Sequence, residues 1–135
     1  MAAVLVASVL GCGLIGGPPS SNPLEVQNGT TLPIAVIVDG EVEAVVPPQA
    51  VTSIAGADLP PMPWTISART PTGRQLGTVD VAADDVVRTT GPNGEESLRG
   101  AGLRIDLSCG RLEIWVGPPM HGPPPGPGTA GDCAP

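Results

Sequence analysis

The pattern of apolar and polar residues between positions 24 and 116 predicts short β-strands separated by turns. Segments in which apolar and polar residues alternate, such as 103–109, are typical of strands with one buried face. The segments expected to form strands are 25–27, 33–38, 41–46, 51–54, 64–70, 75–81, 103–109 and 112–116. Helical periodicity is absent from these segments. We therefore predict an all-β domain: a small immunoglobulin-like β-sandwich of seven or eight short antiparallel strands.

The residues between the expected strands specify turns. Asp39-Gly40 predicts a two-residue type I′ hairpin, because both central positions of that turn favour positive φ. In the second strand of this hairpin, successive residues should point to opposite faces. The core-facing residues would be Val42, Ala44 and Val46, and the solvent-facing residues Glu41 and Glu43. Segment 84–88 is ambiguous, and the polar, Gly-rich segment 89–102 is predicted to be a loop.

The C-terminal segment, residues 117–135, is rich in Pro and Gly and is incompatible with a helix or a central strand. It should be extended and polyproline-like. One interpretation is a linker, or a ligand for a groove that binds proline. The interpretation we favour is a strap that folds back over the sandwich and covers a free sheet edge.

Composition narrows the classes of function. The chain has 135 residues, enough for one domain, and its formal net charge is −7. All six basic residues are Arg, while Phe and Tyr are absent. An acidic chain without a basic stripe or an aromatic stacking platform is not expected to bind nucleic acid.

The N-terminal segment has features that are typical of a targeting signal. Residues 2–10 are apolar apart from Ser8, and their length suits the hydrophobic region of a secretory signal. The sequence Val9-Leu10-Gly11-Cys12 resembles the lipobox of bacterial lipoproteins. The resemblance implies that residues 1–11 are removed as a signal peptide and that Cys12 receives a diacylglycerol thioether and a palmitate. The protein would then be extracytoplasmic and anchored to the bacterial cell membrane through Cys12.

The segment after the lipobox fits this interpretation. Residues 12–23, rich in Gly, Pro and Ser, would be a flexible spacer between the lipid and a sandwich domain at 24–116. One alternative is a retained membrane anchor, although the apolar stretch 2–17 is shorter than the roughly 20 residues that a spanning helix needs. The other alternative is that Cys12 is an ordinary thiol.

The chain has three cysteines, an odd number for an exported protein. If Cys12 carries lipid, as the lipobox implies, Cys109 and Cys133 remain and can form a disulfide, which an oxidising compartment permits. That bond would tie the segment 117–135 back to the sandwich. The alternative is two free thiols.

The body of the chain carries a further resemblance. It lies in segment 64–69, in Thr72-Gly73-Arg74, in Cys109-Gly110-Arg111, in Gly117-Pro118-Pro119 and in Gly131-Asp132-Cys133. With these segments the chain is similar to a group of small uncharacterised bacterial lipoproteins. The resemblance implies no activity.

Residues suited to catalysis or metal binding are sparse. His121 is the only histidine, which excludes a copper site with two His and a zinc site rich in His, and there is no nucleophile elbow. We interpret His121 as a loop residue and expect no metal and no cofactor. The acidic residues Asp80, Asp84, Asp85, Glu95 and Glu96 are interpreted as solvated, with a loop Ca²⁺ at Asp84/Asp85 as an alternative.

The two tryptophans, Trp64 and Trp115, are interpreted mainly as core residues. Trp115 is nevertheless a candidate partner-binding residue, because alternation along 112–116 would place it beside Glu113 on the outer face. The function we expect is a non-enzymatic binding or accessory module of the cell envelope, with an envelope protein as partner. The alternatives are an envelope hydrolase using Asp84/Asp85 or Glu95/Glu96, and a purely structural envelope protein without an exposed apolar patch.

Overall fold

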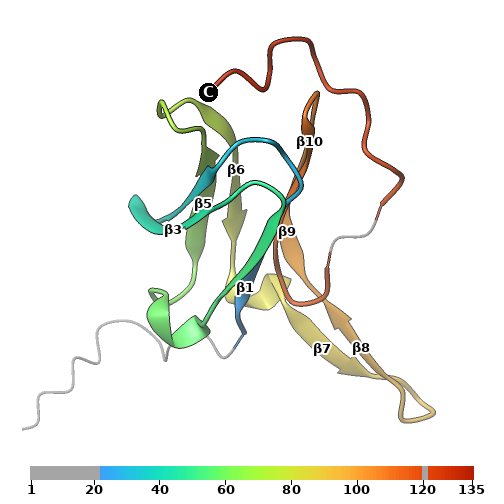
Figure 1. Ribbon diagram of the computed structural model, residues 1–135. Helices are drawn as coiled ribbons and strands as arrows, with labels where there is room; N and C mark the ends of the chain where they lie inside the picture. Colours follow the sequence, from blue (N-terminus) through green and yellow to red (C-terminus); the bar gives the residue numbers. More distant parts are fainter. Residues whose placement is uncertain (1–21, 120–121) are drawn as a thin grey trace, which may run out of the picture.

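The fold is a β-sandwich with a projecting hairpin and a C-terminal strap (Figure 1). The computed structural model describes residues 22–119 and 122–135. The strands are β1 (Leu24–Asn28), β2 (Ile34–Val38), β3 (Glu41–Val46), β4 (Ala50–Ile54), β5 (Trp64–Arg69), β6 (Gln75–Val81), β7 (Val87–Thr90), β8 (Glu96–Arg99), β9 (Ala101–Leu107) and β10 (Gly110–Val116). Two short 3-10 helices, η1 (Gly56–Asp58) and η2 (Ala83–Asp85), complete the list of elements in the described residues. Within these residues, no helix has the length and apolarity to cross a bilayer.

Eight of the strands form the two layers of the sandwich, which confirms the predicted fold class. One sheet, which we call sheet A, has the order β4-β1-β10-β9, and the other, sheet B, has the order β3-β2-β5-β6. All pairings are antiparallel. The first and last strands of the sandwich, β1 and β10, are neighbours in one sheet. In a constant-type immunoglobulin domain they lie in different sheets, so the strand order here is a different one.

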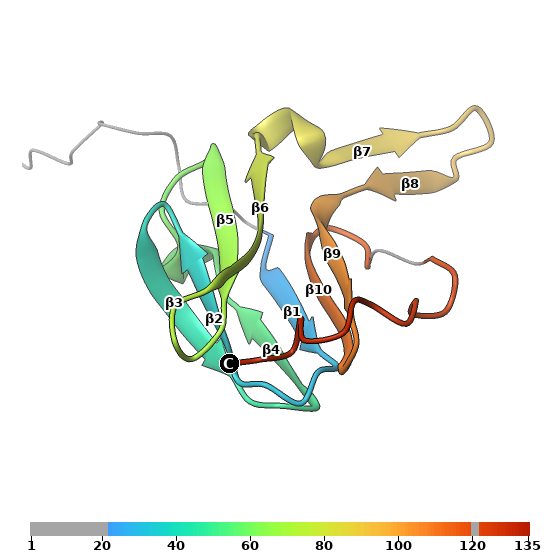
Figure 2. The ribbon, with the colours of Figure 1, turned by 90° about the horizontal axis from the view of Figure 1, so that it is seen from above.

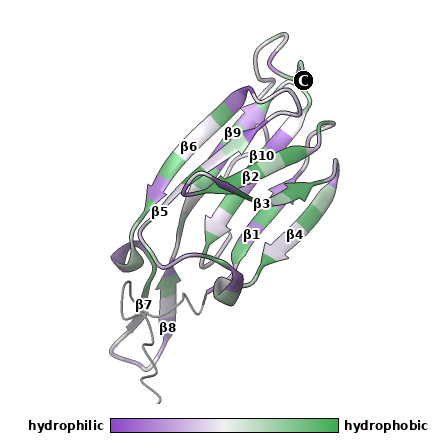
Figure 3. Ribbon diagram, turned by 90° about the vertical axis from the view of Figure 1, so that its left-hand side faces the viewer, coloured by the Kyte–Doolittle hydropathy of each residue, from purple (hydrophilic) through white to green (hydrophobic). Residues whose placement is uncertain are grey.

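Alternation along the strands builds the core, as the bands along the strands in Figure 3 illustrate. Inward residues of both sheets form one apolar cluster, which includes Leu24, Ile34, Ile66 and Ile114, all fully buried. Trp64 belongs to this cluster as predicted, and its indole Nε1 donates to the carbonyl oxygen of Pro60 at 2.6 Å. Without Phe or Tyr, the core is made mainly of aliphatic side chains around a single tryptophan.

The segment predicted to be a loop, 89–102, contains strands, and this prediction was wrong. β7 and β8 form a hairpin that projects away from the sandwich (Figure 2), and β9 already begins at Ala101. The turn closes between Gly91 and Glu95, where the Gly91 amide donates to the Glu95 carbonyl oxygen at 2.7 Å. Across the hairpin, the hydroxyls of Thr89 and Ser97 lie 2.6 Å apart. Polar residues make up most of these two strands, and Thr89, Thr90, Glu96 and Ser97 are exposed.

The predicted orientation of Val42 was also wrong, and a β-bulge explains the error. Val36 pairs with Ala44 and Ile37 pairs with Val42, so Glu43 is an extra residue in β3. An extra residue reverses the alternation beyond it. Val42 therefore points away from the core and is 60% exposed.

Candidate functional site

The C-terminal segment is a strap, as predicted, and it is attached to the sandwich at two places. In Figure 2 it runs past β9 and β10 and ends beside the loop between β5 and β6. Its middle is held on the outer face of sheet A, where the carbonyl oxygen of Pro123 accepts hydrogen bonds from Arg104 Nη2, at 2.9 Å, and from Arg111 Nη2. This part of the strap thus lies against an outer face, whereas we had predicted that the strap covers a sheet edge.

The two arginines belong to a charged network on β9 and β10. Asp106 accepts from Arg104 Nη2 at 3.1 Å and from Arg111 Nε at 2.9 Å, and Glu113 accepts from Arg111 Nη1 at 3.3 Å. The hydrogen bond from Arg104, followed by that from Arg111, lowers the pKa of Asp106 below its ordinary value. Two positive and two negative groups neutralise one another here, so the network is suited to holding the strap carbonyl in place.

An open cleft of about 360 Å³ lies between the strap and this network. Its lining comes from β1 and the residue that follows it, from β10 and from the strap: Gln27, Gly29, Gly110, Arg111, Glu113, Gly122 and Pro125. The charged groups that line it, Arg111 and Glu113, already pair with each other. The cleft therefore offers mainly neutral and paired groups.

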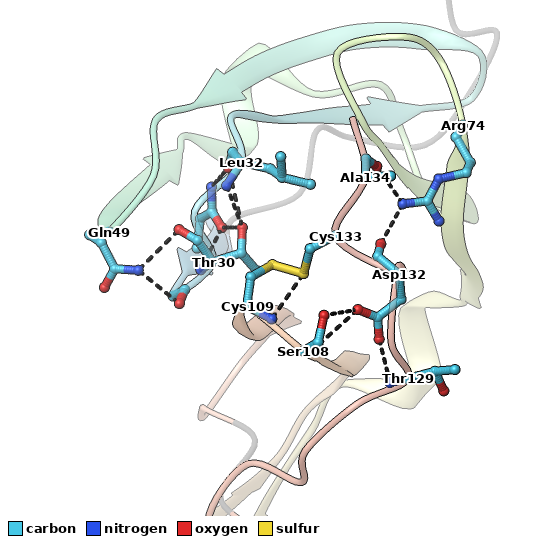
Figure 4. Close-up of a disulfide and its surroundings, with 12 residues drawn as sticks. Thr30, Leu32, Gln49, Arg74, Ser108, Cys109, Thr129, Asp132, Cys133 and Ala134 are labelled. Atoms are coloured by element: carbon cyan, nitrogen blue, oxygen red, sulfur yellow. Dashed lines mark hydrogen bonds between the residues drawn. A yellow bond between two sulfur atoms is a disulfide. The ribbon is translucent and has the colours of Figure 1, made fainter.

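The end of the strap is attached by the predicted disulfide between Cys109 and Cys133, whose Cα atoms are 5.9 Å apart (Figure 4). Beside it, one carboxylate oxygen of Asp132 accepts from the Ser108 amide at 2.9 Å and from the Ser108 hydroxyl, and the other accepts from the Thr129 amide at 2.7 Å. The Ser108 hydroxyl is the main cause of a lowered pKa at Asp132. Arg74 Nη2 donates to the carbonyl oxygens of Asp132 and, at 2.7 Å, of Ala134.

Trp115 lies on the outer side of β10, as alternation predicted, yet it does not form an exposed anchor. Its neighbours in the strand, Ile114 and Val116, belong to the central cluster, whereas Trp115 does not. It is nevertheless only 7% exposed, and Glu113 is 8% exposed. The expectation that Trp115 presents an exposed indole to a partner is therefore contradicted, whereas its burial agrees with our main interpretation of it as a core residue, although it packs outside the central cluster.

The carboxylates considered for catalysis or Ca²⁺ binding are dispersed over exposed elements. Asp84 and Asp85 lie on η2, where Asp85 accepts from the Ala82 amide at 2.7 Å, and Glu95 accepts from the Asn93 amide at 3.1 Å in the β7–β8 turn. Glu96 lies at the start of β8. Among the described residues, no group of three or more His, Cys, Asp or Glu is placed to hold a metal ion. The hydrolase hypothesis requires a pair of carboxylates that converge beneath a cleft. In the described part of the chain, these pairs do not converge in that way.

The exposed apolar surface lies elsewhere. In the part of the chain that the structure describes, three large apolar side chains are exposed: Val42 at 60%, Val45 at 62% and Val51 at 64%. Val42 and Val45 lie on the outer face of sheet B, opposite Ile37 and Ala35 of β2, and Val51 lies on the outer face of β4. β3 and β4 are edge strands that meet on one side of the sandwich, whereas β6 and β9 meet on the other. We call these three residues the valine rim.

An acidic groove of about 390 Å³ lies beside β3. One wall is the end of β2 and the start of β3, and the other is η1 with the residues that follow it. The groove is lined by Val38, Asp39, Glu41, Glu43, Ala57, Asp58, Leu59 and Pro60. Four carboxylates and no basic group are among these lining residues, so the groove is electronegative.

Sequence reasoning missed both the valine rim and the acidic groove. The adjacent valines at 45 and 46 indicate that one of the two faces outward, but the bulge that exposes Val42 has no signal in the sequence. Cys12, the predicted lipidation site, and His121 lie outside the described residues. The sequence matches no family model, and neither a curated protein nor a solved structure is similar to it.

Proposed function

We propose that this protein is a lipoprotein of the bacterial envelope, anchored outside the cytoplasm through Cys12, whose sandwich binds another envelope protein without catalysing a reaction. The anchor rests on the lipobox-like sequence Val9-Leu10-Gly11-Cys12. The Cys109–Cys133 disulfide supports an oxidising compartment, since such bonds are rare in the cytosol.

The observation that carries the binding role is the valine rim. Exposed apolar residues are common on soluble proteins when they are scattered, but here all three lie on the two edge strands of one side of the sandwich, Val42 and Val45 together on the outer face of sheet B and Val51 on that of sheet A. Edge strands carry unpaired backbone donors and acceptors, to which an extended segment of another chain can add. A purely structural spacer has no need of such a surface.

The anchor is tested by the intact mass of the protein extracted from its native membranes, before and after reduction. We expect a chain that begins at a diacylated Cys12 and gains the mass of two hydrogen atoms on reduction. A chain that retains residues 1–11 and carries no lipid would refute the anchor and, with it, the envelope location.

The binding role is tested by photo-crosslinking in the producing cells. A photoreactive amino acid is placed at position 45 or 51 in the valine rim, or at the exposed Asn93 on the β7–β8 turn as a control. We expect one discrete adduct from the rim positions and none from position 93. Equal labelling from all three positions, or none from any, would refute a specific partner surface.

A further inference from the structure

Three features of the β3 side of the valine rim together indicate the kind of ligand that this edge could bind. β3 is the terminal strand of sheet B, so half of its backbone N–H and C=O groups point away from β2. Val42 and Val45 form an exposed apolar pair on the outer face of this strand. The acidic groove, with Glu41 and Glu43 on its β3 wall, lies beside the same strand.

We infer that the β3 edge binds an extended, basic segment of a partner protein as an additional strand of sheet B. The backbone of the segment pairs with the free edge of β3, its apolar side chains on the outer face contact Val42 and Val45, and its Lys or Arg side chains enter the acidic groove. Because side chains alternate along a strand, a segment of alternating apolar and basic residues satisfies both surfaces at once. This inference rests on the proposed binding role and specifies the surface and the chemistry of the partner.

Charge decides which occupant fits this edge. A second copy of the chain would bring its own Glu41 and Glu43 to the same edge, and like charges close to each other destabilise strand pairing. The overall charge of −7 adds long-range repulsion between copies. A basic segment is attracted instead, and salt should weaken its binding.

The bulge at Glu43 supports a binding role for this strand. Without it, Val42 would share the inward face of Ala44, and the outer face of β3 would lack one of its two exposed valines. Bulges frequently redirect a side chain next to a functional site. On β4, the other edge strand of the rim, the pairing with β1 is regular and a single valine is exposed.

The experiment uses the full chain without its signal segment and a fluorescent eight-residue peptide of alternating Val and Lys as the probe. Affinity is measured by fluorescence anisotropy at 50 and 300 mM salt, beside a Val/Glu peptide and a Val/Lys peptide that is N-methylated along both edges. We expect the Val/Lys peptide to bind at least tenfold more tightly than either control peptide, and its affinity to fall at high salt. Equal binding of the N-methylated peptide would overturn strand addition, because methylation removes donors without changing side chains or charge.

Matched variants assign the binding to β3. Val42→Ser/Val45→Ser should weaken binding of the Val/Lys peptide at least tenfold, whereas Val51→Ser on β4 should change it less than twofold. Glu41→Gln/Glu43→Gln should weaken it at least fivefold, whereas Glu95→Gln/Glu96→Gln, which removes the same charge from the β7–β8 hairpin, should leave it unchanged. Thermal unfolding of each variant verifies that it is folded, since every one of these side chains lies at the surface or on its margin.

Two outcomes separate this inference from the proposed function. If photo-crosslinks form at position 51 and the Val/Lys peptide does not bind, the partner uses β4 and the inference is wrong, although the binding role stands. If sedimentation shows a dimer at micromolar concentration that Val45→Ser dissociates, a second copy occupies β3 and the inference is again wrong. If neither rim position crosslinks, the proposed function itself fails.

Discussion

Removing the disulfide should destabilise the sandwich substantially, although the bond lies at its periphery. The perturbation is Cys109→Ser/Cys133→Ser. The bond joins the turn after β9 to a residue 24 positions further along the chain, and it thereby closes a loop that contains β10 and the strap up to Cys133. Cys133 also packs against the core cluster, so the substitution removes a partly buried sulfur as well.

The magnitude follows from the length of the closed loop. For about 25 residues, the loss of loop-closure entropy in the unfolded chain gives a stabilisation of about 3.5 kcal/mol at 25 °C. A domain of this size has a total stability on the order of 5–15 kcal/mol, so the bond supplies a large share of it. The hydrogen bonds of Asp132 and Arg74 remain in the variant, but they cannot constrain the unfolded chain.

The assay is urea unfolding followed by far-UV circular dichroism and by tryptophan fluorescence. A loss of 3.5 kcal/mol should lower the midpoint by about 1–3 M, and the m-value should rise because the unfolded chain exposes more surface without the crosslink. Reduced wild-type protein should behave like the variant, and a reducing agent should not affect the variant. A loss below about 1 kcal/mol with an unchanged m-value would refute this reasoning, since it would mean that the unfolded chain is not constrained by the bond.

Three further predictions concern single positions. Asn28→Ala removes a buried amide that donates to three backbone carbonyls at 2.7–3.1 Å, and we expect a loss of about 2–4 kcal/mol in urea unfolding, against a negligible change for the exposed Gln27→Ala. Asp132→Asn should be less stable than wild type at pH 6, because the pKa of Asp132 in the folded protein is lowered from 3.8. The difference in unfolding free energy should persist above pH 3.8 and disappear as the pH falls through the lowered pKa. A difference that does not depend on pH would contradict this prediction. Gly110→Ala should cost about 1–3 kcal/mol more than Gly73→Ala in thermal unfolding, because both positions have positive φ but an added Cβ at 110 would lie 2.0 Å from a backbone oxygen, whereas 73 is open.

The sandwich was predictable because its strands follow a simple rule. Alternation in β5 and β9 and the apolar run of β2 mark strands whichever partner they pair with. Which strands become neighbours was not predictable from these patterns. The pairing of β1 with β10 joins segments separated by most of the chain, and no local signal specifies such a contact.

The errors at Val42, Trp115 and the β7–β8 hairpin have different physical causes. At Val42, one extra residue in β3 reverses the direction in which the side chain points, and no feature of the sequence Glu41–Val46 indicates where that extra residue lies. At Trp115, the face was predicted correctly, but alternation describes only the face that a residue takes and says nothing of what covers it. In the hairpin, the Asn93-Gly94 turn was a usable signal that the polar flanking residues obscured.

For the candidate sites, the sequence predicted which residues could bond to one another, but it did not predict which residues the fold brings together in space. The pairing of Cys109 with Cys133 followed from the lipobox and the number of cysteines, and the structure confirms it. The position of the strap depends on its hydrogen bonds with Arg104 and Arg111. In the sequence, nothing distinguishes these two residues from other polar residues on the outer faces of strands. Their convergence on one carbonyl oxygen of Pro123 requires the β9–β10 register and the returning strap together.

The two sides of the sandwich differ in what covers their edge strands, and this difference supports the proposal that a partner binds at β3. On the β6–β9 side, Leu103 and Ile105 of β9 lie so close to β6 that a Cβ added at Gly77 would come within 2.8 Å of Ile105, and the strap ends against Arg74 beside β6. On the β3–β4 side, the edge strand β3 presents exposed valines together with acidic side chains. Charged side chains on an edge disfavour pairing between copies, yet the same charges attract a segment of opposite sign. For an edge that is bulged, apolar on its outer face and acidic along its groove, we therefore expect pairing with a second copy of the chain to be disfavoured and, as we propose, binding of a basic segment to be favoured.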